Sequence, residues 1–284
     1  MLSRYLEKSI LDDLAEKMVF LGGPRQVGKT TLVKTLGQDR FKENVKYLNW
    51  DAREDRKRIL AGTFAADEAL IIFDEIHKYR NWKTFIKGFF DKNRARYRII
   101  VTGSSRLDVY RKGGDSLLGR HHHYRLHPLS LREVMSKGAP QAHVGRALDF
   151  QDSTPETRDA FERLLKFGGF PEIFLKGTEK ALRRWHNLRL DALVSQDIRD
   201  IENLRDLSGV ETLIHLLPGK VGGLLSVNSL REDLMVAHKT AASWVDVLER
   251  FYYHFRILPH QSSRIKALRK EPKLYLWDWS EVAD

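Results

Sequence analysis

Residues 22–31 read GGPRQVGKTT, and they follow directly on the short apolar run MVFLG at 18–22. Glycines, a lysine and two threonines at the end of a predicted strand form either an ordinary glycine-rich turn or a cradle for phosphate. Residues 23–30 fit the spacing GxxxxGK[ST], and the helix-like run TTLVKTL comes after them. A strand before the motif and a helix after it favour the phosphate cradle.

Each part of this motif has a physical task. The glycines let successive backbone N–H groups turn inward and form an anion-binding nest. The following helix directs its N-terminus, which carries partial positive charge, at the same place. Lys29 is expected to reach the β- and γ-phosphates, and the Thr30 hydroxyl is expected to bind Mg²⁺. The predicted nucleotide-binding residues are Gly23, Pro24, Arg25, Gln26, Val27, Gly28, Lys29, Thr30 and Thr31.

A second motif supplies the carboxylates that hydrolysis needs. ALIIFDE (69–75) is a continuously apolar run that ends in two acidic residues. Asp74, at the end of a buried strand, is predicted to lie beside Thr30 and to help hold Mg²⁺. Glu75 is the predicted base that polarises the attacking water. The alternative is an Asp-Glu pair that caps the next helix, and the neighbouring phosphate motif argues against it.

Two further polar residues are candidates for contact with the terminal phosphate. YRIIVTGSS (97–105) is another strand that ends in hydroxyls, of which we favour Ser104, with Thr102 as the substitute. A plain turn with a helix cap is the alternative. Arg120 stands just before the fifth strand-like run, a position that suits an arginine finger acting on the nucleotide of a neighbouring copy. A solvated arginine is the alternative for this residue.

Other metal sites are not expected. The chain has no cysteine, which excludes disulfides and thiolate sites. His121, His122 and His123 are consecutive, and adjacent residues on a strand point to opposite faces. No nearby carboxylate completes a site with them. The sequence therefore predicts one metal, Mg²⁺, at Thr30 and Asp74.

Composition bounds the class of protein. The chain has 284 residues, of which 42% are apolar and 31% charged, enough for about two domains of roughly 100–200 residues each. No apolar run approaches the roughly 20 residues that a membrane helix needs. The N-terminal segment MLSRYLEKSILDDLAEK is amphipathic and charged, unlike a signal peptide. We therefore expect a cytoplasmic protein without a membrane partner.

The positive charge is concentrated in one part of the chain. The net charge is +11, and residues 76–133 contain 14 Lys or Arg against 4 Asp or Glu, a local excess of +10. Such a cluster suits a polyanion, either nucleic acid or the nucleotide phosphates of a neighbouring subunit. A solvated basic surface is the alternative.

The order of apolar runs predicts an α/β fold for the first part of the chain. Strand-like runs alternate there with segments long enough for helices, which implies a mostly parallel sheet flanked by helices. Residues 155–204 are predicted to be helical, with an interruption at FGGFPE (167–172) and a long amphipathic helix over 183–201. The five strand-like runs are Val19–Leu21, Val45–Leu48, Leu70–Phe73, Ile99–Val101 and Tyr124–Leu126.

The C-terminal part predicts a winged helix. Ser229 and Glu232 fit a capping box that opens one helix, and Val245, Leu248, Tyr252 and Phe255 give a second helix one buried face. HFRILP (254–259) and KLYLWD (273–278) are predicted to pair as wing strands around a loop at 260–273. The expected domains are residues 1–134, a helical lid-like segment at 135–204, and a winged-helix domain at 205–284.

This module carries two interpretations. If it binds DNA, we expect residues at the start of the second helix and in the wing to make the contacts. The alternative is a winged helix that packs against the ATPase or a partner. The net charge of only +1 over residues 205–284 weakens the argument for DNA binding. In the lid-like segment, Arg183 or Arg184 is a candidate phosphate contact, with a solvated helix face as the alternative. The candidate DNA contacts are His238, Lys239, Thr240, Ser243, Arg264, Lys266, Arg269 and Lys270.

With these motifs in hand, the chain resembles the AAA+ ATPases of bacteria and archaea. More narrowly, it resembles a prokaryotic family that joins such an ATPase to a C-terminal domain of unknown function. The matching stretches are GPRQVGKTTL, IIFDEIHK, VTGSSRL, SLLGR with HPLSLREV, FGGFPE and PKLYLWD. Family members typically continue into a restriction-endonuclease-like fold, which we expect to be largely absent here, so no nuclease activity is assigned.

The resemblance implies a P-loop NTPase sheet of the ASCE type, with the strand order of RecA-like ATPases. It also implies ATP, Mg²⁺ and a homo-oligomer. By position it supports Gly28, Lys29, Thr30, Asp74 and Glu75, together with Ser104 and Arg120. The expected function is Mg²⁺-dependent ATP hydrolysis, coupled to a nucleic acid or a partner protein. The alternatives are a nucleotide-gated switch and a DNA-binding regulator with little turnover.

Overall fold

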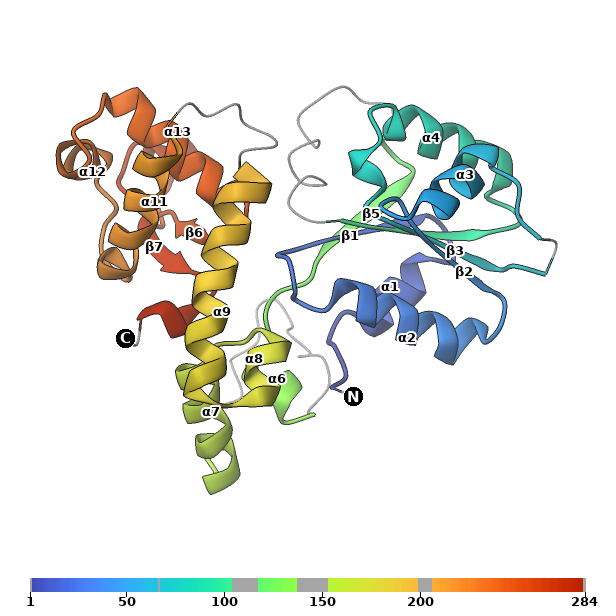
Figure 1. Ribbon diagram of the computed structural model, residues 1–284, viewed down its shortest axis with the longest axis horizontal. Helices are drawn as coiled ribbons and strands as arrows, with labels where there is room; N and C mark the ends of the chain where they lie inside the picture. Colours follow the sequence, from blue (N-terminus) through green and yellow to red (C-terminus); the bar gives the residue numbers. More distant parts are fainter. Residues whose placement is uncertain (1, 66, 104–116, 137–152, 199–205, 283–284) are drawn as a thin grey trace. The chain divides into compact units, whose positions relative to one another are not determined.

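The computed structural model describes residues 2–65, 67–103, 117–136, 153–198 and 206–282, and Figure 1 gives their course. The chain forms two compact units, residues 1–153 and 154–284. Residues 154–198, which we expected to form part of a separate lid, belong to the same unit as the C-terminal module.

The first unit is built on a five-stranded sheet in the order β2-β3-β4-β1-β5, in which every neighbouring pair is parallel. The insertion of β4 between β1 and β3 is the predicted order of RecA-like ATPases, so the P-loop fold class is confirmed. The strand that carries Asp74 is an interior strand. The five strands are β1 Met18–Gly22, β2 Val45–Asn49, β3 Leu70–Asp74, β4 Arg98–Thr102 and β5 His121–Arg125.

Helices cover both faces of this sheet, with α1 and α2 on one side and α3 and α4 on the other (Figure 1). Ile71 and Phe73 pack in the aromatic-rich core beneath α3 and α4, whereas Leu70 meets α2 near Gly37. Because both faces of β3 are buried, its sequence is apolar without alternation. The helices are α1 Glu7–Asp13, α2 Lys29–Phe41, α3 Arg53–Ala61, η1 Ile76–Lys78, α4 Trp82–Asn93 and α6 Leu131–Val134.

The fifth strand differs from the prediction. We expected it at Tyr124–Leu126, and it spans His121–Arg125. The strand lies at the edge of the sheet, so its residues are half-buried or exposed, and polar side chains are tolerated there. The His121 ring stacks on Phe20 with centroids 4.3 Å apart. A search for apolar runs therefore misses the first half of this strand.

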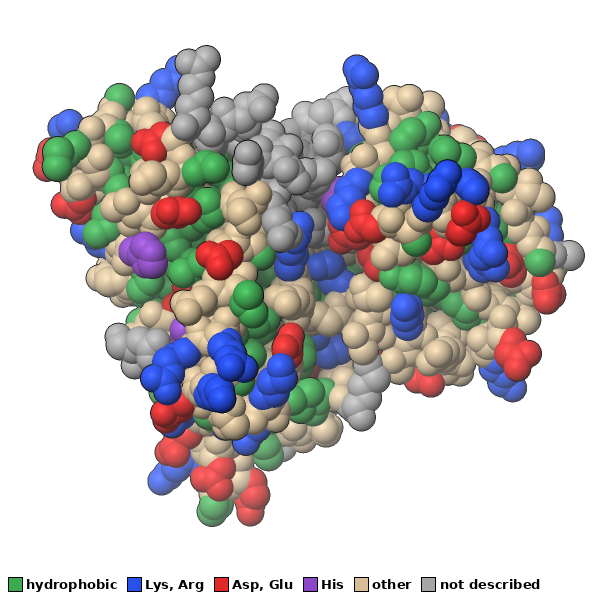
Figure 2. All heavy atoms as spheres, viewed as in Figure 1, with side chains coloured by type: hydrophobic (Ala, Val, Ile, Leu, Met, Phe, Trp, Pro, Cys, Tyr) green, Lys and Arg blue, Asp and Glu red, His purple; other side chains and the backbone are tan. Residues whose placement is uncertain are grey.

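Part of the predicted basic cluster is neutralised within the first unit. Figure 2 shows Lys and Arg side chains interleaved with Asp and Glu over α3 and α4. Arg120 Nε lies 2.8 Å from Asp91, and Lys78 Nζ lies 2.5 Å from Asp51. Asp91 is already counted in the local excess of +10, so only Asp51, which lies outside residues 76–133, compensates a further positive charge of this cluster.

The second unit is mainly helical and ends in a two-stranded antiparallel sheet. The predicted pairing of HFRILP with KLYLWD is confirmed, with His254 opposite Leu276. The segment between these strands contains a short helix where we expected only a loop. The elements are α7 Pro155–Phe167, α8 Pro171–Lys176, α9 Glu179–Ala192, the π-helix η3 Leu193–Ile198, α11 Leu207–Leu216, η4 Pro218–Lys220, α12 Val227–Asp233, α13 His238–Arg250, β6 His254–Ile257, α14 Arg264–Leu268, β7 Lys273–Leu276 and η5 Trp279–Val282.

Two details predicted for α12 and α13 are wrong. Helix α12 begins at Val227 after Ser226, so Ser229 and Glu232 lie inside it and form no capping box. Helix α13 ends at Arg250, because Tyr252 adopts a left-handed backbone with φ of 58° and turns the chain into β6. Both Tyr252 and Phe255 therefore lie outside α13, although apolar spacing continues through them.

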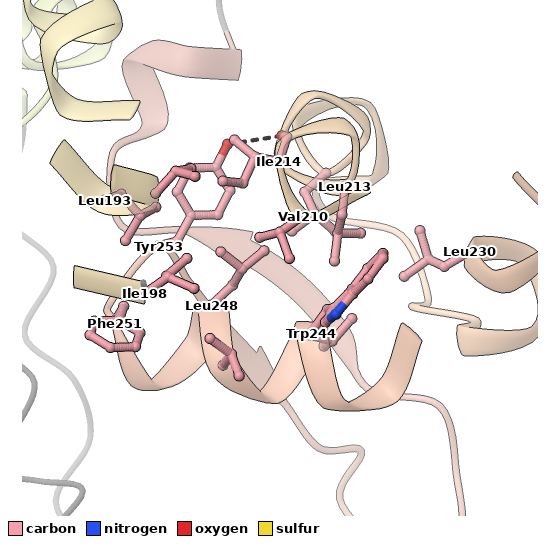
Figure 3. Packing of buried hydrophobic residues seen from close by; sticks show 14 of the residues in the cluster. Leu193, Ile198, Val210, Leu213, Ile214, Leu230, Trp244, Leu248, Phe251 and Tyr253 are labelled. Atoms are coloured by element: carbon pink, nitrogen blue, oxygen red, sulfur yellow. Dashed lines mark hydrogen bonds between the residues drawn. The ribbon is translucent and has the colours of Figure 1, made fainter. Parts of the chain in front are cut away.

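Trp244 of α13 is buried in the second unit's core, between Val210 and Leu213 on one side and Leu230 on the other (Figure 3). Helix α11 approaches this ring closely at Gly209. A Cβ atom there would lie 2.2 Å from the Trp244 ring, so a side chain at Gly209 would force the two helices apart.

A buried polar network joins α9 to the segment after β7. Asp278 is 1% exposed, and its Oδ2 accepts hydrogen bonds from Trp185 Nε1 at 2.9 Å and Arg189 Nη1 at 2.7 Å. Arg189 also contacts Glu281 Oε1 at 3.1 Å. Buried charges are stable only when paired and hydrogen-bonded in this way, so the network fixes residues 278–281 to the helices of the unit.

No helix in the described part of the chain is both long and apolar enough to cross a membrane.

Burial of His254 predicts acid sensitivity of the second unit. Its Nε2 donates to the Val245 carbonyl at 3.0 Å, and burial lowers the pKa of His254 from 6.5 to about 4. The unfolded chain takes up this proton near pH 6.5 and the folded chain only near pH 4. The free energy of unfolding should therefore fall, by about 3 kcal/mol in total, as the pH is lowered through this interval.

Urea unfolding at pH 7 and pH 4.5 measures this loss. In His254→Gln the loss should be smaller, because the titrating group is gone while an amide can still donate to Val245. His215→Gln, at an exposed position, should behave as the wild type. An identical loss in wild type and His254→Gln would contradict the prediction.

Candidate nucleotide-binding site

The predicted site residues come from the carboxyl ends of three neighbouring strands. In the sheet, β3, β4 and β1 are adjacent and parallel, so their carboxyl ends lie at one edge. The 23–28 loop follows β1, Glu75 follows β3, and Thr102 is the last residue of β4. The fold therefore brings together residues that are far apart in the sequence.

The backbone of the loop at 23–28 depends on its glycines. Gly23 has a φ of 144°, and a Cβ atom there would lie 2.4 Å from the carbonyl oxygen of Leu126. Gly28 has a φ of 95° and is the N-cap of α2. Arg25 and Gln26 are exposed, whereas Val27 is fully buried and anchors the loop. The loop thus presents its backbone at the start of a 13-residue helix, as phosphate binding requires.

The Lys29 amine lies within the curve of this loop. Its side chain is largely buried, and Nζ donates to the carbonyls of Gly23 at 2.9 Å and Pro24 at 2.6 Å. Thr30 and Thr31 follow it in the first turn of α2, where Thr30 is half-buried and Thr31 exposed. The loop, the lysine and the helix N-terminus thus converge on one place.

Asp74 accepts hydrogen bonds from three hydroxyl groups. Its Oδ2 accepts from Thr30 Oγ1 at 2.9 Å and from Tyr47 Oη at 2.5 Å, and its Oδ1 accepts from Thr102 Oγ1. The donors come from α2, β2 and β4, so one carboxylate connects three elements. Burial, together with the bond to Asp74, raises the pKa of Tyr47 well above 10, so its hydroxyl stays a donor.

The residues at this point fit Mg²⁺. Thr30 and Asp74 offer a hydroxyl and a carboxylate oxygen 2.9 Å apart, and hard oxygen ligands are what this ion prefers. Among the described residues, no three His, Cys, Asp or Glu side chains gather to form a metal cage. Mg²⁺ is commonly bound by one or two protein oxygens, with phosphates and water completing the octahedron.

Glu75 has an unusual backbone and a shifted pKa. It adopts a left-handed conformation with φ of 57°, and its N–H donates to the Thr102 carbonyl at 3.0 Å. Its Oε2 lies 3.4 Å from His77 Nε2 and 3.6 Å from Lys78 Nζ. Burial raises the pKa of Glu75, and Lys78 acts in the opposite direction. A strained backbone and a perturbed pKa are both typical of functional sites.

The other predicted phosphate contacts lie elsewhere. Ser104 falls outside the described residues. Its substitute, Thr102, is fully buried, and its hydroxyl bonds to Asp74. Arg120 precedes β5 at the strand's amino end, which is the edge of the sheet opposite to the 23–28 loop. It makes two hydrogen bonds to Asp91 of α4, at 2.8 and 3.0 Å.

Sequence reasoning missed two residues that support this site. Tyr47 bonds to Asp74, and Lys34 Nζ lies 3.8 Å from the centre of its ring. Arg4 is buried, with Nε 2.8 Å from Glu133 and Nη1 2.9 Å from the Val27 carbonyl in the loop. The only signal for Glu133 is its capping box with Ser130, and no local pattern reveals its partner.

Two family models match the chain, one for each unit. Residues 15–135 match a family described as AAA domain. Residues 158–282 match a family described as Domain of unknown function (DUF8612). The first unit therefore contains an AAA domain, and the second contains a domain of unknown function. The AAA match contains the 23–28 loop, both acidic residues and Arg120, and it agrees with the strand order of the sheet.

Curated relatives cover nearly all of this chain. An uncharacterized protein of Methanocaldococcus jannaschii is 24% identical over 284 residues, which cover 93% of this chain and 61% of the relative. An uncharacterized protein of Mycobacterium tuberculosis is 24% identical over 265 residues, covering 92% of this chain and 54% of the relative. The chain therefore spans 61% and 54% of the length of these relatives.

Several solved structures are distantly similar to this chain. Aeropyrum pernix Orc1 in complex with DNA is 14% identical, with a TM-score of 0.37, covering 96% of this chain and 88% of that one. The Thermotoga maritima RuvB Holliday junction branch migration motor is 16% identical, with a TM-score of 0.38, covering 94% and 92%. AMPPCP-bound DnaA from Aquifex aeolicus is 14% identical, with a TM-score of 0.42, covering 86% of each chain.

The Arg4 contacts predict a stability effect from a residue far from the loop in sequence. Arg4→Ala removes one partner of a buried ion pair and leaves the Glu133 carboxylate without a counter-ion, which should lower the free energy of unfolding by about 3–5 kcal/mol. Replacing both residues, as Arg4→Met with Glu133→Leu, should cost less because no buried charge remains.

Urea unfolding of these variants measures both effects. The control is Lys8→Ala, at an exposed position on α1, which should leave the transition unchanged. A loss below 1 kcal/mol for Arg4→Ala, or a greater loss in the double variant, would contradict the prediction.

Proposed function

We propose that this AAA protein binds ATP with Mg²⁺ at the 23–31 segment and hydrolyses it. The observation that carries the proposal is the 2.9 Å contact between Thr30 Oγ1 and Asp74 Oδ2, beside the Lys29 amine. An oxygen pair suited to a divalent cation and a cation suited to phosphate lie at the N-terminus of one helix. This combination is what a nucleoside triphosphate with its metal requires.

Each residue has a separate task in this proposal. The backbone N–H groups of the loop and Lys29 bind the β- and γ-phosphates, and Thr30 and Asp74 hold Mg²⁺. When bound, Mg²⁺ neutralises charge that develops on the phosphate oxygens. Glu75 orients the attacking water and accepts its proton. Burial raises the pKa of Glu75, which makes it a better proton acceptor than an exposed carboxylate.

Glu75→Gln tests the base. This variant should bind ATP with nearly normal affinity and lose about 100- to 10,000-fold in turnover, since it removes proton transfer but keeps the side chain's size. Lys29→Ala should lose binding. Titration with a fluorescent ATP analogue and phosphate release, each with Mg²⁺ and with EDTA, measure the two steps.

Glu16→Gln, an exposed carboxylate in the same unit, is the matched control and should keep full activity. Undiminished turnover in Glu75→Gln would reject Glu75 as the base. If the wild type binds ATP tightly without turnover, the protein is instead a nucleotide-gated switch.

We also propose that Arg120 acts on the nucleotide of a neighbouring copy. The strand that follows Arg120 has five residues, about 16 Å of chain, which separates it from the phosphate loop of its own chain. Its guanidinium is about one-third exposed and is held in one orientation by Asp91. An arginine finger supplied from another subunit neutralises charge in the transition state.

Mixing two inactive variants tests this arrangement. Arg120→Ala should lower turnover by about 1,000-fold or more, and Lys29→Ala should be inactive because it lacks its own site. In mixed assemblies, Lys29→Ala chains can supply Arg120 to the intact sites of Arg120→Ala chains, so activity should partly return. Absence of any recovery, with mixed oligomers present by cross-linking, would contradict action between copies.

A further inference from the structure

The C-terminal part of the second unit contains two helices joined by a tight turn. Helices α12 and α13 are separated by residues 234–237, and Met235 adopts a φ of 52° in that turn. A connection of three to four residues is typical of a helix-turn-helix. A β-hairpin follows at once, and Lys273 on its second strand, β7, also bridges to Leu224. Helix-turn-helix and hairpin together have the topology of a winged helix.

Helix α13 divides sharply into two faces. Trp244, Val245 and Leu248 are buried in the core of the unit. On the other side, Lys239 and Ser243 are exposed and lie four residues apart on one face. Nothing in the described part of the second unit covers this face near its N-terminal end, so α13 is available for contact along about two turns.

The hairpin adjoins this exposed face. Arg256 of β6 donates to Asp246 Oδ1 at 2.7 Å and to Glu249 Oε2 at 2.9 Å, both on α13. Asp246 continues the exposed face from Ser243 towards the C-terminal end of the helix. These bonds pair both acidic residues of α13 with one guanidinium, which leaves a net charge of −1 among the three groups, and they fix the hairpin beside the helix.

Beyond β6, the hairpin is strongly basic. Residues 264–273 contain five Lys or Arg and one Glu. Lys266, Arg269 and Lys270 are exposed, and none of them forms an ion pair within the described residues. By contrast, Lys220 pairs with Asp233 in the same unit. Ile265 and Leu268 are also exposed here.

We propose that α13 and the hairpin form a binding surface for duplex DNA. The end of α13 that carries Lys239 and Ser243 enters the major groove, which is wide enough for one helix. Lys266, Arg269 and Lys270 bind phosphates on the adjacent backbone. A duplex fits this surface better than a single strand, because the exposed face offers a helix edge and cations but no exposed aromatic platform on α13.

Fluorescence anisotropy of the full chain with a labelled 24-base-pair DNA duplex of mixed sequence tests the proposal. Binding should weaken as salt rises. The triple variant Lys266→Ala, Arg269→Ala, Lys270→Ala should bind at least about tenfold more weakly at 100 mM salt. It should also make the negative slope of log affinity against log salt shallower by about 2.7, since each phosphate contact contributes about −0.9.

A second basic patch of the same unit provides the matched control. Figure 2 shows Lys and Arg side chains gathered over α8 and the start of α9, where Lys180, Arg183 and Arg184 are exposed. Their triple replacement by Ala removes the same charge and should change DNA affinity less than threefold. Thermal melting should confirm that both triple variants stay folded.

Lys239→Ala with Ser243→Ala tests the groove contact separately. It should weaken DNA binding and leave ATP turnover without DNA unchanged, so the outcome is independent of the proposed hydrolysis. Three results would overturn the proposal: no binding to the duplex at 50 mM salt, equal losses in both triple variants, or equal affinity for duplex RNA. Duplex RNA has a major groove too deep and narrow for a helix to read.

Discussion

The carboxylate of Asp74 accepts hydrogen bonds from hydroxyl groups of α2, β2 and β4, and through them it connects the elements at the proposed nucleotide-binding edge of the first unit. Thr30 ties it to the helix that starts at the loop, while Thr102 ties it to the neighbouring strand. The Thr102 carbonyl also accepts the N–H of Glu75. The position of the proposed base is therefore coupled to the position of the proposed metal ligand through a single threonine.

Local motifs made most of this site predictable. Lys29 and Thr30 follow a glycine-rich loop whose spacing is set by the backbone, and Asp74 ends a run that is apolar because both faces of β3 are buried. Such signals lie within about ten residues, so the sequence alone reveals them. The strand order also followed, once the motifs indicated the family. The edge strand at His121–Arg125 was predicted at the wrong position, because its half-exposed residues give no apolar signal in the sequence.

Contacts between distant segments were not predictable. Arg4 and Glu133 are 129 positions apart, and Tyr47 and Asp74 are 27 apart. Neither pair has a spacing that a helix or a strand imposes, so only the folded chain brings the partners together. In the second unit, the error at Tyr252 has the same origin. Apolar spacing continued past the end of α13, while the left-handed backbone that ends the helix left no mark in the sequence.

The buried charged groups at the proposed nucleotide-binding edge have hydrogen-bond partners within the protein. The Lys29 amine donates hydrogen bonds to two carbonyls of its own loop, and Asp74 accepts hydrogen bonds from three hydroxyl groups. Burying either charge without partners would be costly, yet here the protein itself supplies them. Folding of the unit therefore does not depend on a bound ligand to balance these groups. The nucleotide proposed for this site would then bind by exchanging hydrogen-bond partners with groups that are already in place.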